Sequence, residues 1–118
     1  MSIIDHESAA EEIRRPGYRR RRLSGYDDGF QLTFDYHIVD PGSGAPPHHH
    51  DIDELIVVLE GEVEAELSGE THRALPMQTI AIPKDAHHGF TVVGAEPAKL
   101  LIFFPATEAF TEKHTTYL

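Results

Sequence analysis

The sequence predicts an all-β fold, and three observations indicate this class. Apolar and polar residues alternate along several short segments, as they do in strands with one face against a core. Turn-forming residues interrupt the chain about every 6–12 residues, which is typical of sandwiches and small barrels. Most of the eight prolines lie at the borders of these segments, where a missing N–H breaks no ladder hydrogen bond. Together they predict a sandwich or small barrel of about eight or nine strands.

Residues 1–29 predict a short N-terminal helix and an arginine-rich arm or strand. Ser8-Ala9-Ala10-Glu11 has the pattern of a capping box, and Pro16-Gly17 would end the helix that follows it. Six of the ten basic residues fall between Arg14 and Arg22. No aromatic-interleaved basic surface follows them, so ion pairs within the chain or across a dimer are favoured over nucleic-acid binding.

Residues 30–105 predict the barrel. From Phe30 to Ile38 the residues alternate, which predicts a strand with one apolar face. The apolar run Leu55–Leu59 predicts a strand buried on both faces. In 63–67 apolar residues alternate with glutamates, so one face is core and the other is solvated. Further short strands are predicted near 71–75, 78–82, 89–93 and 99–104. Residues 106–118 form a tail without a clear signal.

The composition excludes several function classes. A length of 118 residues suits one domain. Without cysteine there is no thiolate metal site, disulfide or thiol nucleophile, which suits a reducing compartment. The apolar runs are far shorter than the roughly 20 residues of a membrane-spanning helix, and the N-terminus has no secretory pattern. A net charge of −10 disfavours nucleic acid. We therefore expect a cytoplasmic protein without membrane or nucleic-acid partners.

Five of the nine histidines lie in two clusters, His48-His49-His50 and His87-His88. On an extended strand His48 and His50 share a face, with Cα atoms about 6.6 Å apart, so both imidazoles can reach one metal. Glu54 lies where the apolar strand begins, and a buried acid is costly unless it is paired or bound to metal. His88 opens a later strand, and strand starts can meet in a barrel. Three imidazoles and one carboxylate leave open positions on a metal, as a catalytic site requires.

The alternative for these histidines is a solvated location in surface loops. The His-x-His pair, the nearby carboxylate and the distant histidine after a proline-led turn favour metal binding over that alternative. His49 and His87 lie one residue out of register, so we expect them at the surface or behind the ligands.

The segment 42–61 resembles the complete first motif of the cupin superfamily. Both glycines, both histidines and the glutamate of that motif are present, as Gly42, His48, His50, Glu54 and Gly61. The second motif is matched in part. Pro83 and His88 fit it, whereas Met77 and Asp85 stand where glycines are usual and Val92 stands where asparagine is usual. Asp85 is tolerable there, because aspartate accepts a positive φ better than most residues.

This resemblance covers about Phe30 to Phe104 and implies a jelly-roll, or double-stranded β-helix, barrel with a metal inside. The implied ligands are His48, His50, Glu54 and His88. They suit one divalent transition metal per chain, which could be iron, manganese, nickel, copper, cobalt or zinc.

Two function classes follow from the resemblance. The first is a metal-dependent enzyme acting on a small bidentate organic substrate, with a dioxygenase-like oxidoreductase favoured and an isomerase, decarboxylase or lyase as alternatives. The second is a non-catalytic cupin that binds a small ligand or sugar. No residue is assigned as a general base. The candidates for the pocket wall are Phe34, Tyr36, Phe90, Phe103 and Phe104, and the polar candidates behind the ligands are Thr33, Tyr36, His37 and Gln78. Because jelly rolls leave exposed sheet edges, we also expect a homodimer.

Overall fold

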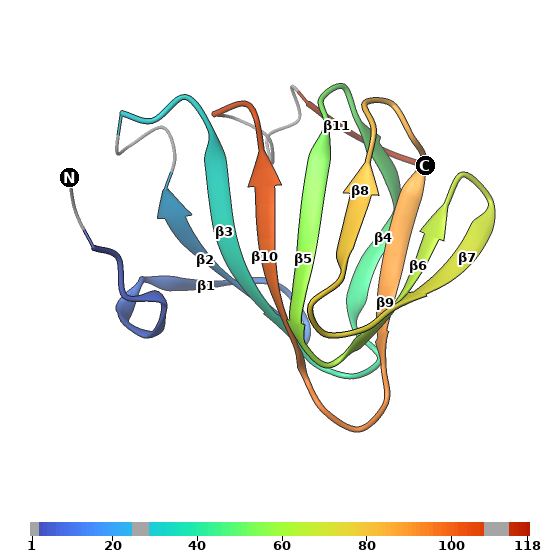
Figure 1. The fold of residues 1–118 in the computed structure, drawn as a ribbon, viewed down its shortest axis with the longest axis horizontal. Coiled ribbons are helices and arrows are strands. Elements are labelled where there is room, and N and C mark those ends of the chain that lie inside the picture. The colour runs from blue at the N-terminus through green and yellow to red at the C-terminus, as the bar shows by residue number, and fades with distance from the viewer. Residues whose placement is uncertain (1–2, 25–28, 108–113) are drawn as a thin grey trace.

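Two antiparallel β-sheets face each other in the computed structural model, which describes residues 3–24, 29–107 and 114–118 (Figure 1). The six-stranded sheet has the order β1 (Glu11–Arg15), β2 (Tyr18–Ser24), β3 (Thr33–Val39), β10 (Ala98–Phe104), β5 (Glu54–Glu60) and β8 (Thr79–Ile82). The five-stranded sheet has the order β11 (Thr115–Tyr117), β4 (Gly44–His50), β9 (His88–Val93), β6 (Glu62–Leu67) and β7 (Glu70–Ala74). The predicted all-β jelly-roll class is confirmed.

The main apolar core lies between the two sheets. Alternate residues of β10 point into it, and its most deeply buried large side chains are Val39, Ile56, Val58, Val63, Val92, Leu100, Ile102 and Phe104. Burial of each such side chain stabilises the fold by about 1.5–3 kcal/mol. This core fills one part of the barrel and leaves polar side chains to line the other part.

Strand β3 turns most of its apolar residues outward and its polar residues inward. The alternation itself is confirmed, but the apolar residues Tyr36 and Ile38 belong to a second cluster with Leu23, on the outer face of the six-stranded sheet. The polar residues Asp35 and His37 are instead fully buried inside the barrel. Alternation predicts that two faces differ, but it does not say which of them faces the interior.

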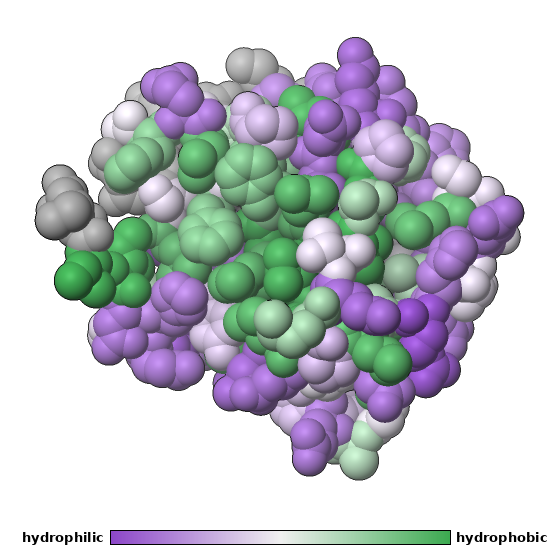
Figure 2. All heavy atoms as spheres, viewed as in Figure 1, coloured by the Kyte–Doolittle hydropathy of each residue, from purple (hydrophilic) through white to green (hydrophobic). Residues whose placement is uncertain are grey.

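Strand β5 is also not buried on both faces, as its apolar sequence predicts. Its inner residues, Ile56 and Val58, are buried, whereas Leu55 is 41% exposed on the outer face. Apolar residues gather over the middle of the face in Figure 2, where Figure 1 places β3, β10 and β5. Over β5 the outer surface of this sheet is therefore apolar and partly exposed, whereas over β3 it is covered.

The N-terminal segment forms a strand where the capping pattern predicts a helix. The helical part is a single 3-10 turn at His6–Ser8, capped by the Asp5 side chain. Glu11–Arg15 is β1, because it pairs with the arginine strand β2 and places its acids opposite the arginines. Arg20 pairs with Glu12 and Arg21 with Glu11, so these two arginines of β2 are neutralised within the chain. No helix in the described ranges is long and apolar enough to cross a membrane.

Four turn positions singled out by the sequence motifs have a left-handed backbone. The two motif glycines, Gly42 and Gly61, have φ of 84° and 83°. Met77 and Asp85, which stand where glycines are usual, both have φ of 67°. The turns therefore keep the conformation that glycine favours, and an L-residue there costs about 1–2 kcal/mol of conformational strain.

We expect Met77→Gly to raise the free energy of unfolding by about 0.5–1 kcal/mol, because relief of strain exceeds the entropy that glycine adds to the unfolded chain. Met77 is 81% exposed, so no packing is lost. Thermal and urea unfolding measure the change. The control Ala81→Gly, at an exposed strand position, should lower stability instead. Equal destabilisation by both substitutions would contradict the strain argument.

Candidate metal centre

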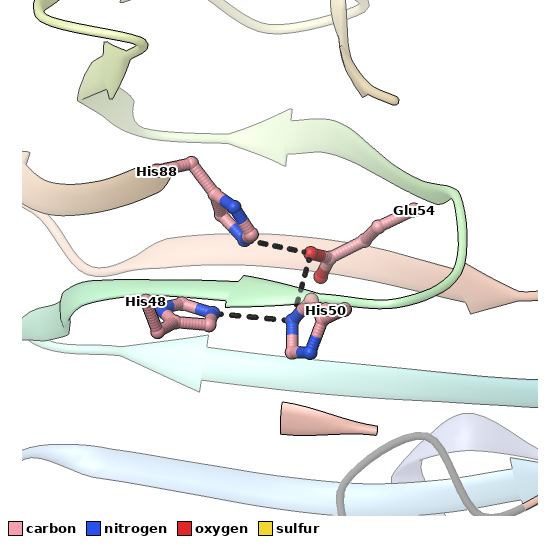
Figure 3. Close-up of side chains that lie close together, drawn as sticks. All are labelled: His48, His50, Glu54 and His88. Carbon is pink, nitrogen blue, oxygen red and sulfur yellow. Dashed lines mark hydrogen bonds and ion pairs between the residues drawn. The ribbon is translucent and has the colours of Figure 1, made fainter. Parts of the chain in front are cut away.

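Four buried side chains meet between the sheets, namely His48, His50, Glu54 and His88 (Figure 3). One ligand atom from each lies within 4.8 Å of the others. The Nε2 atoms of His48 and His50 are 3.1 Å apart, and Glu54 Oε1 lies 3.3 Å from His50 Nε2 and 3.0 Å from His88 Nε2. The structure thus brings together the four residues that the sequence motifs predict as ligands.

The backbone of β4 and the two turns around it position these groups. The β4–β9 ladder is irregular between Ala45 and His48, where the prolines have no N–H to donate. Two hydrogen bonds then tie the β4–β5 turn to the β8–β9 turn: Lys84 N donates to Asp53 Oδ1 and Asp85 N donates to His50 O. These bonds hold the start of β9, and with it His88, beside β4 and β5.

The outer nitrogen of each imidazole also has a partner. His48 Nδ1 donates to Pro46 O at 2.7 Å, and His88 Nδ1 donates to Ala86 O at 2.9 Å. His50 Nδ1 lies 2.9 Å from Thr115 Oγ1. Since a carbonyl oxygen can only accept, the neutral His48 and His88 rings present unprotonated Nε2 atoms to the centre. Such outer contacts are the usual way in which metal-binding histidines are oriented.

The donor set fits a metal ion. When His88 is neutral and Glu54 is ionised, lone pairs of His88 Nε2 and the carboxylate face each other at 3.0 Å, and either a proton on His88 or a metal ion between the two groups relieves their repulsion. Donors bound at about 2.1 Å lie about 3.0 Å apart at right angles and about 3.4 Å apart in a tetrahedron. Three of the separations, at 3.0–3.3 Å, fall in that range, and all four ligand atoms lie within 4.8 Å of one another. Four nitrogen and oxygen donors could therefore hold one divalent transition metal.

Burial and mutual contact shift the pKa values of the group in different directions. Burial lowers the pKa of His48 to about 4. Burial opposes charge on both Glu54 and His88, but their other contacts together outweigh it. The hydrogen bonds and charges of His50 and His88 hold the pKa of Glu54 low, and those of Glu54, with the hydrogen bond to Ala86 O, hold the pKa of His88 high. The metal-free centre thus favours an ionised Glu54 beside a protonated His88, which is the proton that a metal must displace.

A cavity of about 30 Å³ adjoins the four side chains. Of the predicted wall residues, Phe90 lines this cavity, and Phe104 packs edge-on against His50 with ring centroids 5.0 Å apart. The predictions for Phe34, Tyr36 and Phe103 are wrong, because these residues lie on the outer face of the sheet.

The polar candidates divide in the same way. His37 lines the cavity, whereas Thr33 is buried inside but bonds to Ala106 O, and Gln78 is exposed and holds a turn. His49 and His87 stack on each other outside the four-residue group, with ring centroids 5.1 Å apart, as their register predicts.

Several residues around the cavity were not predicted from the sequence. Three of them, Arg14, Arg15 and Tyr18, come from the arginine-rich arm. The run of basic residues there indicates ion pairing and gives no sign that Tyr18 faces a cavity. Thr115 and Tyr117 come from β11, a strand of three residues that pairs with β4 across His48–His50. A polar segment of three residues has no periodic signal, so the strand β11 could have been predicted only from its pairing with β4.

Comparison with known proteins agrees with this geometry. The sequence model of the Cupin domain family matches residues 35–104. A curated protein, the polyketide synthase CurC of Streptomyces cyaneus, is 37% identical over 101 residues. That match covers 84% of this chain and 66% of CurC, so the chain spans just under two-thirds of that relative.

Solved structures share the fold over nearly the whole chain. KdgF from Halomonas sp. matches with a TM-score of 0.80 at 22% identity, and the match covers 94% of this chain and 99% of the KdgF chain. The polyketide cyclase RemF from Streptomyces resistomycificus has a TM-score of 0.79 at 26% identity and covers 96% of this chain and 89% of its own.

We expect the affinity for Zn²⁺ or Co²⁺ to fall at least about 100-fold between pH 8 and pH 5, because protons compete for the imidazoles. The raised pKa of His88 means that protons compete for this ligand at a higher pH than for an ordinary histidine. Calorimetry at both pH values, with elemental analysis of the purified protein, measures the effect. His50→Ala should lose stoichiometric metal, and the exposed control His72→Ala should keep it. Equal affinity at the two pH values would rule out the three-histidine set.

Proposed function

This chain belongs to the Cupin domain family, and we propose on that basis that it is a metal-dependent enzyme acting on a small substrate with two carbonyl oxygens. One observation carries the proposal: three imidazoles and a carboxylate, all buried, converge beside a cavity that also exposes polar side chains. Four protein ligands leave positions on a five- or six-coordinate metal for substrate.

The proposed substrate class is a poly-β-ketone of the polyketide type, and the proposed reaction is ring closure by carbon–carbon bond formation. Two relatives with the words polyketide synthase and polyketide cyclase in their names, at 37% and 26% identity, support this class. Neighbouring carbonyl groups of such a chain can chelate one cation. A bound metal would supply a Lewis acid that withdraws electrons from these carbonyls.

The residues of this chain would have distinct tasks. His48, His50, Glu54 and His88 would hold the ion, and the apolar wall formed by Ile56, Phe90 and Ile102 would exclude water. A cavity of about 30 Å³ holds roughly one water molecule, so a substrate must displace residues at its rim. Arg14 and Arg15 contribute to the cavity lining, where their positive charge suits an acidic enol.

A dioxygenase-like oxidoreductase is the second candidate. The same neutral imidazoles and carboxylate suit Fe²⁺, and open positions on the metal could take both a bidentate substrate and O₂. One experiment separates the two functions, because ring closure consumes no oxygen.

Metal-free protein reloaded with Zn²⁺, Mn²⁺ or Fe²⁺ should close the ring of a synthetic poly-β-ketone thioester at least about 100-fold faster than buffer with the same ion. Product formation is followed by chromatography with mass spectrometry, as a cyclic product of unchanged mass or, after spontaneous dehydration, of one water less, and oxygen is followed by an electrode. Turnover with Zn²⁺ and without oxygen uptake supports the cyclase. Oxygen uptake restricted to the Fe²⁺ protein supports the oxygenase instead. No reaction with any ion, in a protein that binds the ion stoichiometrically, would contradict both functions.

We also propose that the protein is a homodimer joined through the apolar outer face of the six-stranded sheet. Leu55, Val57, Leu101 and Phe103 lie side by side on this face, with Leu55 41% exposed. Two chains of net charge −10 repel each other, so they approach most easily where acidic side chains are absent. Apolar patches of this kind mark association surfaces. A cytoplasmic location stays a prediction from the absence of cysteine.

Light scattering should give twice the chain mass of 13.2 kDa. Leu55→Lys with Val57→Lys should shift the protein to a monomer, because two desolvated charges would face two more across the interface. The control Met77→Lys replaces an exposed apolar residue in a turn and should leave the dimer intact. A wild-type protein that scatters as a monomer at all concentrations would refute this interface.

A further inference from the structure

A second polar cluster lies inside the barrel, apart from the four candidate ligands. Tyr18 Oη lies 2.5 Å from His37 Nδ1, and His37 Nε2 lies 3.4 Å from Asp35 Oδ2. The Arg22 side chain donates to the other carboxylate oxygen, Asp35 Oδ1. Asp35 and His37 are nearly inaccessible to solvent, and Tyr18 is only 4% exposed.

The cluster and the candidate metal centre share one cavity. Tyr18 and His37 line the same cavity as the three imidazoles and Glu54. Tyr18 comes from β2 and His37 from β3, so both lie in the six-stranded sheet, whereas the histidine ligands come from the opposite sheet. A substrate in the cavity would therefore contact the ion on one side and the Tyr18 hydroxyl on the other.

Resting on the proposed function, we propose that Tyr18 is the catalytic acid–base group of this site and that His37 and Asp35 act through it as a proton relay. The order of groups is a hydroxyl, an imidazole and a carboxylate, which is the arrangement that activates a hydroxyl by a neighbouring base. Tyr18 touches the substrate, whereas His37, Asp35 and Arg22 are positioning residues.

The hydrogen-bond directions follow from the partners. An ionised Asp35 can only accept, so His37 presents N–H at Nε2, and its unprotonated Nδ1 accepts from the Tyr18 hydroxyl. Burial lowers the pKa of His37 and raises the pKa of Tyr18, so the resting cluster holds a neutral ring and a neutral phenol. The Glu54 carboxylate adds to the rise in the pKa of Tyr18, whereas the Arg15 guanidinium, 5.1 Å from the centre of the Tyr18 ring, opposes it.

The proton transfers balance without a co-reactant. Tyr18 Oη accepts the proton from the carbon between two carbonyls while its own proton passes to His37 Nδ1. The C–H electron pair forms the enolate, and His37 becomes an imidazolium facing Asp35. When the enolate carbon bonds to a second carbonyl carbon of the substrate, that carbonyl oxygen takes a proton from Tyr18. His37 then returns its proton to Tyr18, and the cluster is restored.

Tyr18→Phe should lower kcat for ring closure about 100-fold, the usual contribution of a general acid–base group, and leave KM and metal content nearly unchanged. The matched control is Tyr36→Phe. This tyrosine is equally buried but lies on the outer face of the same sheet, so turnover should persist. Equal turnover of the two variants, in a protein whose wild type is active, would refute the role of Tyr18 and leave the proposed function standing.

A second measurement needs neither metal nor turnover. In the metal-free protein, ¹H–¹⁵N NMR should show His37 as the Nε2–H tautomer. In Asp35→Asn, Arg22 keeps the amide oxygen at the Oδ1 position, so the amide NH₂ faces His37 and should convert it to the Nδ1–H tautomer. A wild-type His37 protonated at Nδ1, or a tautomer unchanged in Asp35→Asn, would overturn the relay. This holds even if the wild type closes no ring, which would count against the proposed function alone.

Discussion

The buried carboxylate of Glu54 is the constraint around which the interior of this barrel is organised. Transfer of a charged carboxylate from water to the interior costs several kcal/mol, and that cost must be offset on the spot. His50 and His88 provide contacts at 3.3 and 3.0 Å, and both histidines are themselves fixed by outer hydrogen bonds. The strands that carry Glu54, His50 and His88 must then meet at their ends. The hydrogen bonds between the β4–β5 turn and the β8–β9 turn hold these strand ends together.

Polar groups on the inner face of the six-stranded sheet determine which residues lie on its outer face. The inner face of β3 carries Asp35 and His37, so its apolar residues lie on the outside. The N-terminal turn and β2 cover part of that outer face through Ala9 and Leu23. Beyond this cover, the outer face of β5 and β10 stays apolar and partly exposed. Because side chains alternate along a strand, the polar residues inside β3 and the apolar residues on its outer face occur together.

The sequence predicted the fold class and the four candidate ligands because both leave local patterns. Alternation and turn spacing reveal strands, and His48, His50, Glu54 and His88 stand at fixed spacings. It did not predict which face of β3 is buried, since alternation looks the same whichever face is inside. It missed β1 and β11, because a short polar strand forms through its partner rather than through its own residues. Tyr18 was missed for the same reason: only the pairing of β2 with β3 brings it to His37.

The outer contacts of the three imidazoles differ in kind. Main-chain carbonyls hold His48 and His88, whereas a side chain from the far end of the chain, Thr115, holds His50. No direct substitution can delete a carbonyl, so the orientation of the first two rings is robust to mutation at the contacting positions. The third can be altered by a single codon change that leaves every ligand in place. Natural or laboratory evolution could therefore adjust the electronic character of this centre through one position, with little risk to the fold.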